Sequence, residues 1–301
     1  MRRTSFISIM KTFPPFVRSI VRAGRTLPAL PLPTFPKQRG NPITEHHRLS
    51  WGARFLLVFC RSPGSPDYSM SGIHYDPGNE LDVFQEVFPN LRREIAGKCV
   101  IDFGSGLGYQ SMALAVAGAR RVVGIEIDEQ RIEIGRARIT EQGLARKVCF
   151  ERKIPNGLRA DVILSQNSFE HFLDSKRILA EMSAALAPGG KIYITFAPPW
   201  NAPWGAHMAF FCRLPWVHLF FPERTIMEVR SLFRPGTERT YREVGLAQMS
   251  LAQFERTVKS SGLQIQFRRY DCIRGMNALQ WTPLRELFVN RVSCVLRAPQ
   301  N

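Results

Sequence analysis

Hydrophobic and polar residues follow two alternating patterns along this chain. Short apolar runs rich in β-branched residues predict strands, and longer segments with an apolar residue at every third or fourth position predict helices. The predicted strands cover residues 100–102, 121–126, 147–152, 160–165, 192–196, 263–269 and 288–296, and the predicted helices cover 109–115, 129–142, 175–186 and 250–261. Strands that alternate with helices in this way are typical of an α/β fold.

Polar residues and glycines mark the ends of several of these elements. Asp128 is placed to cap the helix 129–142, and Ser250 with Gln253 forms a capping box at the start of the helix 250–261. Pro188, Gly189 and Gly190 predict a turn between a helix and a strand, because proline stops a helix and glycine adopts positive φ angles.

Three glycines follow the first predicted strand at every second position, as Gly104, Gly106 and Gly108. A strand that turns through glycines into a helix brings the backbone close to a nucleotide-like ligand. Dinucleotide-binding loops have the spacing G-x-G-x-x-G and place a pyrophosphate at the helix N-terminus. Here the spacing is G-x-G-x-G, and the carboxylate of Asp102 would repel a pyrophosphate. It suits a ligand with hydroxyls, an amino group and a positive centre.

Glu126 ends the second predicted strand, 18 residues after Gly108. An α/β nucleotide site places a carboxylate on the ribose hydroxyls at this position, one helix and one strand after the loop. The alternative is a solvated acid at a strand end, and the glycine loop could likewise be purely structural.

The segment from Asp102 to Gly108 resembles the D/E-x-G-x-G-x-G loop of class I S-adenosylmethionine-dependent methyltransferases, in their small-molecule (methyltransferase type 11-like) branch. Glu170-His171 after the fourth predicted strand and Pro188-Gly189-Gly190 before the fifth also match that family. The resemblance extends over about residues 78–301.

The resemblance implies a Rossmann-like seven-stranded sheet, mostly parallel, with an antiparallel C-terminal hairpin strand and helices on both faces. It implies S-adenosyl-L-methionine as cofactor, with Glu126 on both ribose hydroxyls and Ile127 beside the adenine. The expected cofactor-binding residues are Asp102, Gly104, Ser105, Gly106, Gly108, Glu126, Ile127, Gln166 and Asn167.

The net charge of +16 is unevenly distributed along the 301 residues. Residues 1–44 contain eight basic residues, seven prolines and no acid, so we expect a disordered extension outside the core. An organelle-targeting peptide and a start codon placed too far upstream are the alternatives. No stretch reaches the length of a membrane-spanning helix. The six scattered cysteines include no C-x-x-C, so we expect no metal site and a reducing, cytoplasmic location.

About 50 residues, 197–248, separate the fifth predicted strand from the helix 250–261. We expect this aromatic-rich insertion in the 45–301 methyltransferase domain to form a lid over the acceptor. The predicted lining residues are Trp200, Trp204, Phe210, Phe211 and Trp216. Their apolar character favours a hydrophobic or lipid-like acceptor or peripheral contact with a membrane. The alternative is that these aromatic residues only pack the insertion onto the sheet.

The sequence therefore predicts in-line transfer of a methyl group to a small acceptor, with His171 and His207 as candidate general bases. Two other functions remain open: a non-catalytic binding or membrane-associated protein, and an RNA methyltransferase that uses the basic N-terminal segment. A nucleic-acid acceptor is disfavoured. Enzymes that methylate exocyclic amines on nucleic acid carry an Asn/Asp-Pro-Pro-aromatic signature after the fourth strand, whereas Ala197-Pro198-Pro199-Trp200 begins with Ala and follows the fifth predicted strand. The oligomeric state is left open.

Overall fold

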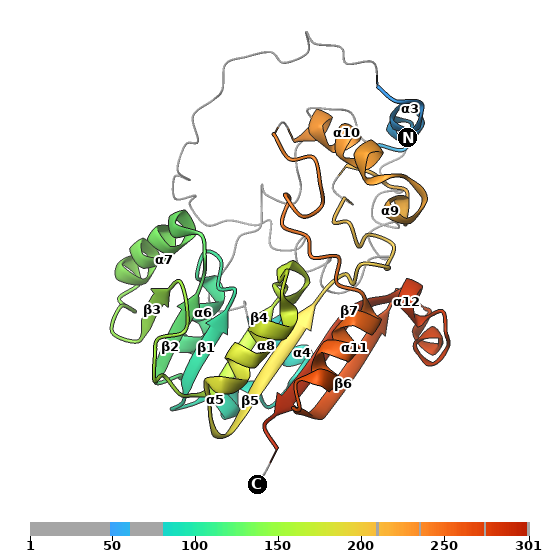
Figure 1. Ribbon diagram of the computed structural model, residues 1–301. Helices are drawn as coiled ribbons and strands as arrows, with labels where there is room; N and C mark the ends of the chain where they lie inside the picture. The colour runs from blue at the N-terminus through green and yellow to red at the C-terminus, as the bar shows by residue number, and fades with distance from the viewer. Residues whose placement is uncertain (1–48, 61–80, 209–210, 235, 274, 300–301) are drawn as a thin grey trace, which may run out of the picture. The chain divides into compact units, whose positions relative to one another are not determined.

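A computed structural model describes residues 49–60, 81–208, 211–234, 236–273 and 275–299 (Figure 1). The chain divides into two compact units, which are described separately below. The larger unit holds residues 75–207 and 241–301, and the smaller unit holds residues 1–74 and 208–240. The expected disordered extension, residues 1–44, lies outside the described residues.

A seven-stranded sheet forms the centre of the larger unit, with the strand order β3-β2-β1-β4-β5-β7-β6. Its strands are β1 Cys99–Phe103, β2 Arg121–Ile125, β3 Val148–Glu151, β4 Ala160–Gln166, β5 Leu186–Phe196, β6 Gln264–Cys272 and β7 Val289–Arg297. Strands β1 to β5 pair in parallel, whereas β7 is antiparallel to both β5 and β6. The expected Rossmann-like fold with an antiparallel C-terminal hairpin strand is therefore confirmed.

Helices cover both faces of this sheet, as expected. One apolar core joins the sheet to α8 Ser175–Ala184 and α11 Leu251–Ser260, which lie on the near face in Figure 1. The other core joins it to α4 Asp82–Val87, α5 Leu91–Ile95, α6 Tyr109–Val116 and α7 Glu129–Glu141. Neighbouring residues of β1 enter opposite cores, since Val100 belongs to one and Ile101 to the other. This double burial explains why the central strands are continuous apolar runs.

Short helical segments complete the larger unit: η1 Phe169–His171, η2 Asn277–Trp281 and α12 Arg285–Phe288. The two predicted N-caps are confirmed. The side chain of Asp128 accepts hydrogen bonds from the amides of Gln130 and Arg131, and that of Ser250 accepts one from the amide of Gln253.

The Pro188-Gly189-Gly190 turn is the main correction to the predicted elements. Strand β5 already begins at Leu186, which pairs with Ala160, and the next pair joins Lys191 to Val162. The intervening residues bulge out of the ladder, with Gly189 at a φ angle of +79°. The turn residues therefore interrupt a strand and do not precede it.

The smaller unit is helical in its described part, with α3 Trp51–Leu57, α9 Val217–Phe220 and α10 Glu223–Phe233. An isolated antiparallel bridge joins Cys60 to Cys212. Phe211, one of the expected lid residues, is buried against Phe233 at a ring-centroid distance of 4.9 Å, and Phe210 lies outside the described residues. In the part of the chain that the structure describes, no helix is both long and apolar enough to cross a membrane.

Candidate functional site

The glycine loop connects β1 to α6 and is held against the end of β2. The amides of Gly104 and Ser105 both donate to the carbonyl of Ile125, at 2.9 and 3.0 Å. Gly104 and Gly108 adopt φ angles of +82° and +84°, and Gly108 is the N-cap of α6. These two positions require glycine, because L side chains rarely adopt this backbone conformation.

Packing behind the loop adds a second requirement for small residues. Phe150 of β3 is fully buried. A Cβ atom at Gly108, Gly124 or Gly135 would lie 2.5, 2.5 or 2.9 Å from a carbon of its ring. The ring therefore fills the space that glycines leave on the loop, on β2 and on α7. A Cβ atom at Gly106 would meet nothing within 4 Å, so this side of the loop is open to a ligand.

Asp102 is buried at the end of β1, with 2% of its surface exposed. Its carboxylate accepts hydrogen bonds from Gln110 Nε2 at 2.9 Å and from Ser111 Oγ at 2.6 Å. Burial raises the pKa of this carboxyl to about 7, although the two hydrogen bonds lower it; the nearby Glu126 adds to the rise. The site thus maintains a carboxyl group at a considerable electrostatic cost.

Glu126 follows β2 and connects the second strand to the glycine loop. Its Oε2 accepts from the Gly106 amide at 2.9 Å, and its Oε1 accepts from the amides of Ile127 and Asp128 at 2.8 and 3.0 Å. Arg131 lies 3.9 Å from Oε2. The Ile127 side chain is 77% exposed, so it is free to contact a planar ligand.

The end of β4 lies against the same loop. Ser168 Oγ is 2.9 Å from the Gln166 carbonyl and 3.2 Å from the Gly104 carbonyl, and the two acceptors share its single proton. Asn167 is exposed and has a φ angle of +48°. Ser105 Oγ and Gln166 Oε1 are buried atoms that lack a hydrogen-bond partner within the described residues. Buried polar atoms of this kind indicate a missing ligand or water.

The two candidate bases lie together, because the rings of His171 and His207 meet edge to face at a centroid distance of 5.4 Å. His171 Nδ1 is 2.7 Å from the carbonyl of Gly245, which requires a proton on Nδ1. The other ring nitrogen, Nε2, is then the basic one. Burial lowers the pKa of His171, against the rise caused by the Gly245 hydrogen bond.

Glu170 is the residue directly before the candidate base His171. The structure places it in the interior, 4% exposed, with Oε2 lacking a partner among the described residues. Burial raises the pKa of its carboxyl to about 8, more than the amides of Glu170 and Ala197 lower it. Burial therefore favours the protonated form of Glu170, which can donate a hydrogen bond.

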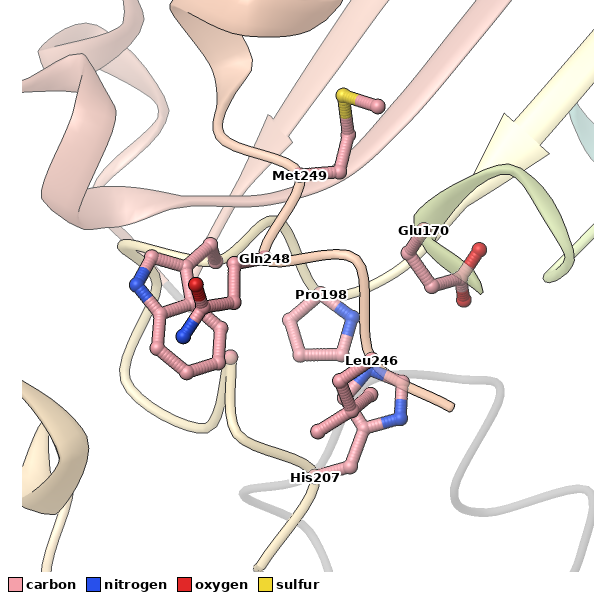
Figure 2. Close-up of a pocket in the computed structure, with 8 residues that line it drawn as sticks. Glu170, Pro198, His207, Leu246, Gln248 and Met249 are labelled. Atoms are coloured by element: carbon pink, nitrogen blue, oxygen red, sulfur yellow. The ribbon is translucent and has the colours of Figure 1, made fainter. Parts of the chain in front are cut away.

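Glu170 lines a narrow pocket with residues from two segments that follow β5 and precede α11 (Figure 2). The amide of Ala247 donates to the Glu170 carbonyl, and that of Trp200 donates to the Met249 carbonyl, so hydrogen bonds hold both segments in place. The lining residues are Glu170, Pro198, Trp200, Gly205, His207, Leu246, Gln248 and Met249.

The structure therefore brings most predicted site residues into two connected groups. Asp102, the glycines and Glu126 surround the loop, and His171 and His207 lie beside the Glu170 pocket. Sequence reasoning did not identify Gln110, Ser111 or Ser168 as partners of the loop. The polar positions 110 and 111 on an otherwise apolar helix were the available signal.

Comparison with known proteins assigns the central part of the chain. Residues 101–194 match a family model described as a methyltransferase domain. The chain is 29% identical over 162 residues to the ribosomal protein L11 methyltransferase of Photobacterium profundum, covering 51% of this chain and 53% of that protein. It is 28% identical over 133 residues to the ubiquinone biosynthesis O-methyltransferase of Thiobacillus denitrificans, covering 40% and 56%.

A solved S-adenosylmethionine-dependent methyltransferase from Mesorhizobium loti aligns with 70% of this chain and 97% of its own, at 16% identity and a TM-score of 0.46. The chain spans about half the length, or less, of the curated relatives it matches. The expected family is confirmed for residues 101–194.

Proposed function

Because residues 101–194 carry a methyltransferase domain, we propose that this protein transfers a methyl group from S-adenosyl-L-methionine to a small, largely apolar acceptor. The observation that carries the proposal is the meeting of two strand ends at the glycine loop. Glu126 at the end of β2 is bonded to the Gly106 amide, and Asp102 at the end of β1 is buried beneath the same loop.

The donor would lie along the open side of the loop at Gly106. Glu126 Oε2 would accept a hydrogen bond from a ribose hydroxyl, since each carboxylate oxygen has two acceptor sites and Oε2 bonds to only one amide, that of Gly106. Ile127 would cover one face of the adenine. The negative charge of Asp102 would attract the positively charged end of the donor, which offsets the cost of burying that carboxylate. Ser105 Oγ and Gln166 Oε1 would gain the partners they lack.

The acceptor would lie against the mouth of the pocket at Glu170, which has an empty volume of about 170 Å³ and is lined in part by Pro198, Trp200, Leu246 and Met249. Apolar walls that also carry the polar side chains of Glu170, His207 and Gln248 suit an apolar molecule with a few polar atoms, one of them the reacting hydroxyl or amino group. The protonated Glu170 would donate a hydrogen bond to a second polar atom of such a molecule. The pocket is smaller than a quinone-like or lipid-like molecule, so only the reacting end of such an acceptor would reach Glu170.

The bound donor supplies a methyl group on a sulfonium, and the electrons of the broken carbon–sulfur bond remain on sulfur. The acceptor oxygen or nitrogen forms the new bond to carbon and must lose its proton. His171 Nε2 would take that proton, since the pKa of this ring is lowered and Nδ1 already donates to Gly245. The remaining catalysis is alignment of the two reactants.

Calorimetric titration of S-adenosyl-L-methionine and S-adenosyl-L-homocysteine tests the donor site. We expect binding to the wild type and a loss of about tenfold or more in Glu126→Gln, because a charge-assisted hydrogen bond contributes about 1.5–3 kcal/mol. The matched control is Glu129→Gln on α7, whose side chain is 52% exposed, and it should bind as the wild type does. A folded wild type that binds neither compound, or equal affinity in both variants, would reject the proposed site.

Methyl transfer to quinone-like phenols, to lipid amines and to a ribosomal protein, each supplied separately, tests the acceptor. His171→Gln should lower kcat on the accepted compound without weakening donor affinity. A reaction only with ribosomal protein would overturn the small-acceptor part of the proposal and leave the donor site intact.

A further inference from the structure

Helix α3 of the smaller unit presents its large apolar side chains to solvent. Trp51, Phe55, Val58 and Phe59 are 83%, 44%, 78% and 38% exposed. Their spacing of i, i+4, i+7 and i+8 places them on one face of the helix and of the turn that continues it. The small Ala53 faces inward with Leu56. Apolar residues therefore occupy both faces of this helix, and most of the large ones point outward.

Helix α9 extends this apolar face. The ring of Phe221, which follows α9, stacks on Phe55 with centroids 6.0 Å apart. The preceding residues, Leu219 and Phe220, are 40% and 76% exposed. We call the set Trp51, Phe55, Val58, Phe59, Leu219 and Phe220 the apolar patch. Clusters of exposed large apolar residues of this kind mark interaction sites, since single ones are common and groups are not.

Exposed basic residues occur in the same unit as the apolar patch. Arg54 lies on the same outward face of α3, and Arg213 and Arg224 are exposed in the same unit. Residues 1–44, which precede α3 in the sequence, contain eight basic residues and no acid. A second copy of the chain would bring these like charges together across a two-fold interface, which is unfavourable. An anionic surface would be attracted to them.

We propose that the apolar patch docks onto an anionic phospholipid bilayer, with α3 lying in the plane of the interface. Apolar and aromatic residues on one face of a short helix, together with basic residues, are the features of an interfacial helix. Tryptophan favours this depth of the bilayer. The basic segment that precedes α3 adds attraction to anionic headgroups. The inference does not depend on methyl transfer.

Co-sedimentation of the full chain with vesicles tests the proposal. The vesicles contain phosphatidylcholine alone or with phosphatidylglycerol added. We expect binding to the mixed vesicles and weaker binding to the neutral ones. Trp51→Ser and Phe220→Ser should each lower vesicle affinity by about tenfold or more, because each removes a large apolar side chain that would be buried in the bilayer. Because both side chains are more than 75% exposed, neither substitution should disturb folding, which circular dichroism checks.

The matched control is Trp281→Ser, since Trp281 is 85% exposed but lies in the larger unit. It should bind vesicles as the wild type does. Unchanged binding in the Trp51→Ser/Phe220→Ser double variant, or an equal loss in Trp281→Ser, would overturn the proposal. So would equal binding to neutral and anionic vesicles. If the wild type forms an oligomer and does not bind vesicles, and the double variant is monomeric, the proposal is overturned and the patch is an interface with a second copy.

Discussion

Asp102→Asn should make this protein more stable at neutral pH, and the size of the gain should depend on pH. The carboxyl is buried with 2% of its surface exposed, and burial raises its pKa from 3.8 to about 7. A pKa difference of about 3 corresponds to about 4 kcal/mol, at about 1.4 kcal/mol per unit.

The sign follows from where the proton is lost. Below about pH 4 the folded and the unfolded chain both retain the proton, so the ionisation of Asp102 does not change the free energy of unfolding. Between about pH 4 and pH 7 the unfolded chain releases the proton while the folded chain retains it, and the free energy of unfolding falls as the pH rises. Above pH 7 the whole cost of about 4 kcal/mol is present. Asparagine does not titrate and avoids this cost, and Ser111 and Gln110 can reorient to pair with an amide.

Urea unfolding of the wild type and of Asp102→Asn from pH 4 to pH 9 measures the difference. Every other titrating group is common to both proteins, so the difference isolates position 102. The control is Asp82→Asn, whose side chain is 58% exposed, and it should follow the wild type at every pH. A difference between Asp102→Asn and the wild type that stays constant from pH 4 to pH 9 would refute the reasoning.

Three further predictions concern stability. Gly108→Ala should lower the free energy of unfolding by about 2–5 kcal/mol, because backbone strain adds to the clash with the Phe150 ring. Gly143→Ala should lower it only by the strain of about 1–2 kcal/mol, because its Cβ would meet nothing within 4 Å. Equal losses in the two variants by urea unfolding would show that the ring yields. Glu170→Gln should gain stability over the wild type as the pH rises from 5 to 9, because the raised pKa of Glu170 makes its ionised form costly; parallel urea curves at both pH values would contradict this. Ser250→Ala should lower the unfolding free energy by about 1 kcal/mol through loss of the N-cap of α11, and an unchanged urea midpoint would contradict that role.

The sheet and its longer helices were predictable because apolar residues repeat at a regular spacing over most of each element. The helices α4, α5 and α10 were missed. The first two have six and five residues, which is too few for a 3.6-residue period to emerge from the sequence. The Pro188–Gly190 bulge was misread because the residues that make a turn are the same ones that make a bulge.

In the site, the residues with a local signal were found and those that depend on distant contacts were not. The glycine spacing and Glu126 can be read from one short segment. The burial of Glu170 arises from segments that follow β5 and precede α11, which no local pattern connects to it. Helix α3 was not predicted either, since its seven residues are too few for a clear helical period, and such a period would not show which way its apolar face points.

Phe150 affects how the glycine loop could be moved into another protein. The loop from Asp102 to Gly108 is one continuous segment of the sequence, but the ring that packs behind it comes from β3. The space for that ring comes from Gly124 and Gly135 on two further elements. A graft of the loop alone would carry the backbone turn without the filling that supports it. The transferable unit is a set of positions on four separate elements, and substitutions in this set are expected to be tolerated only in combination.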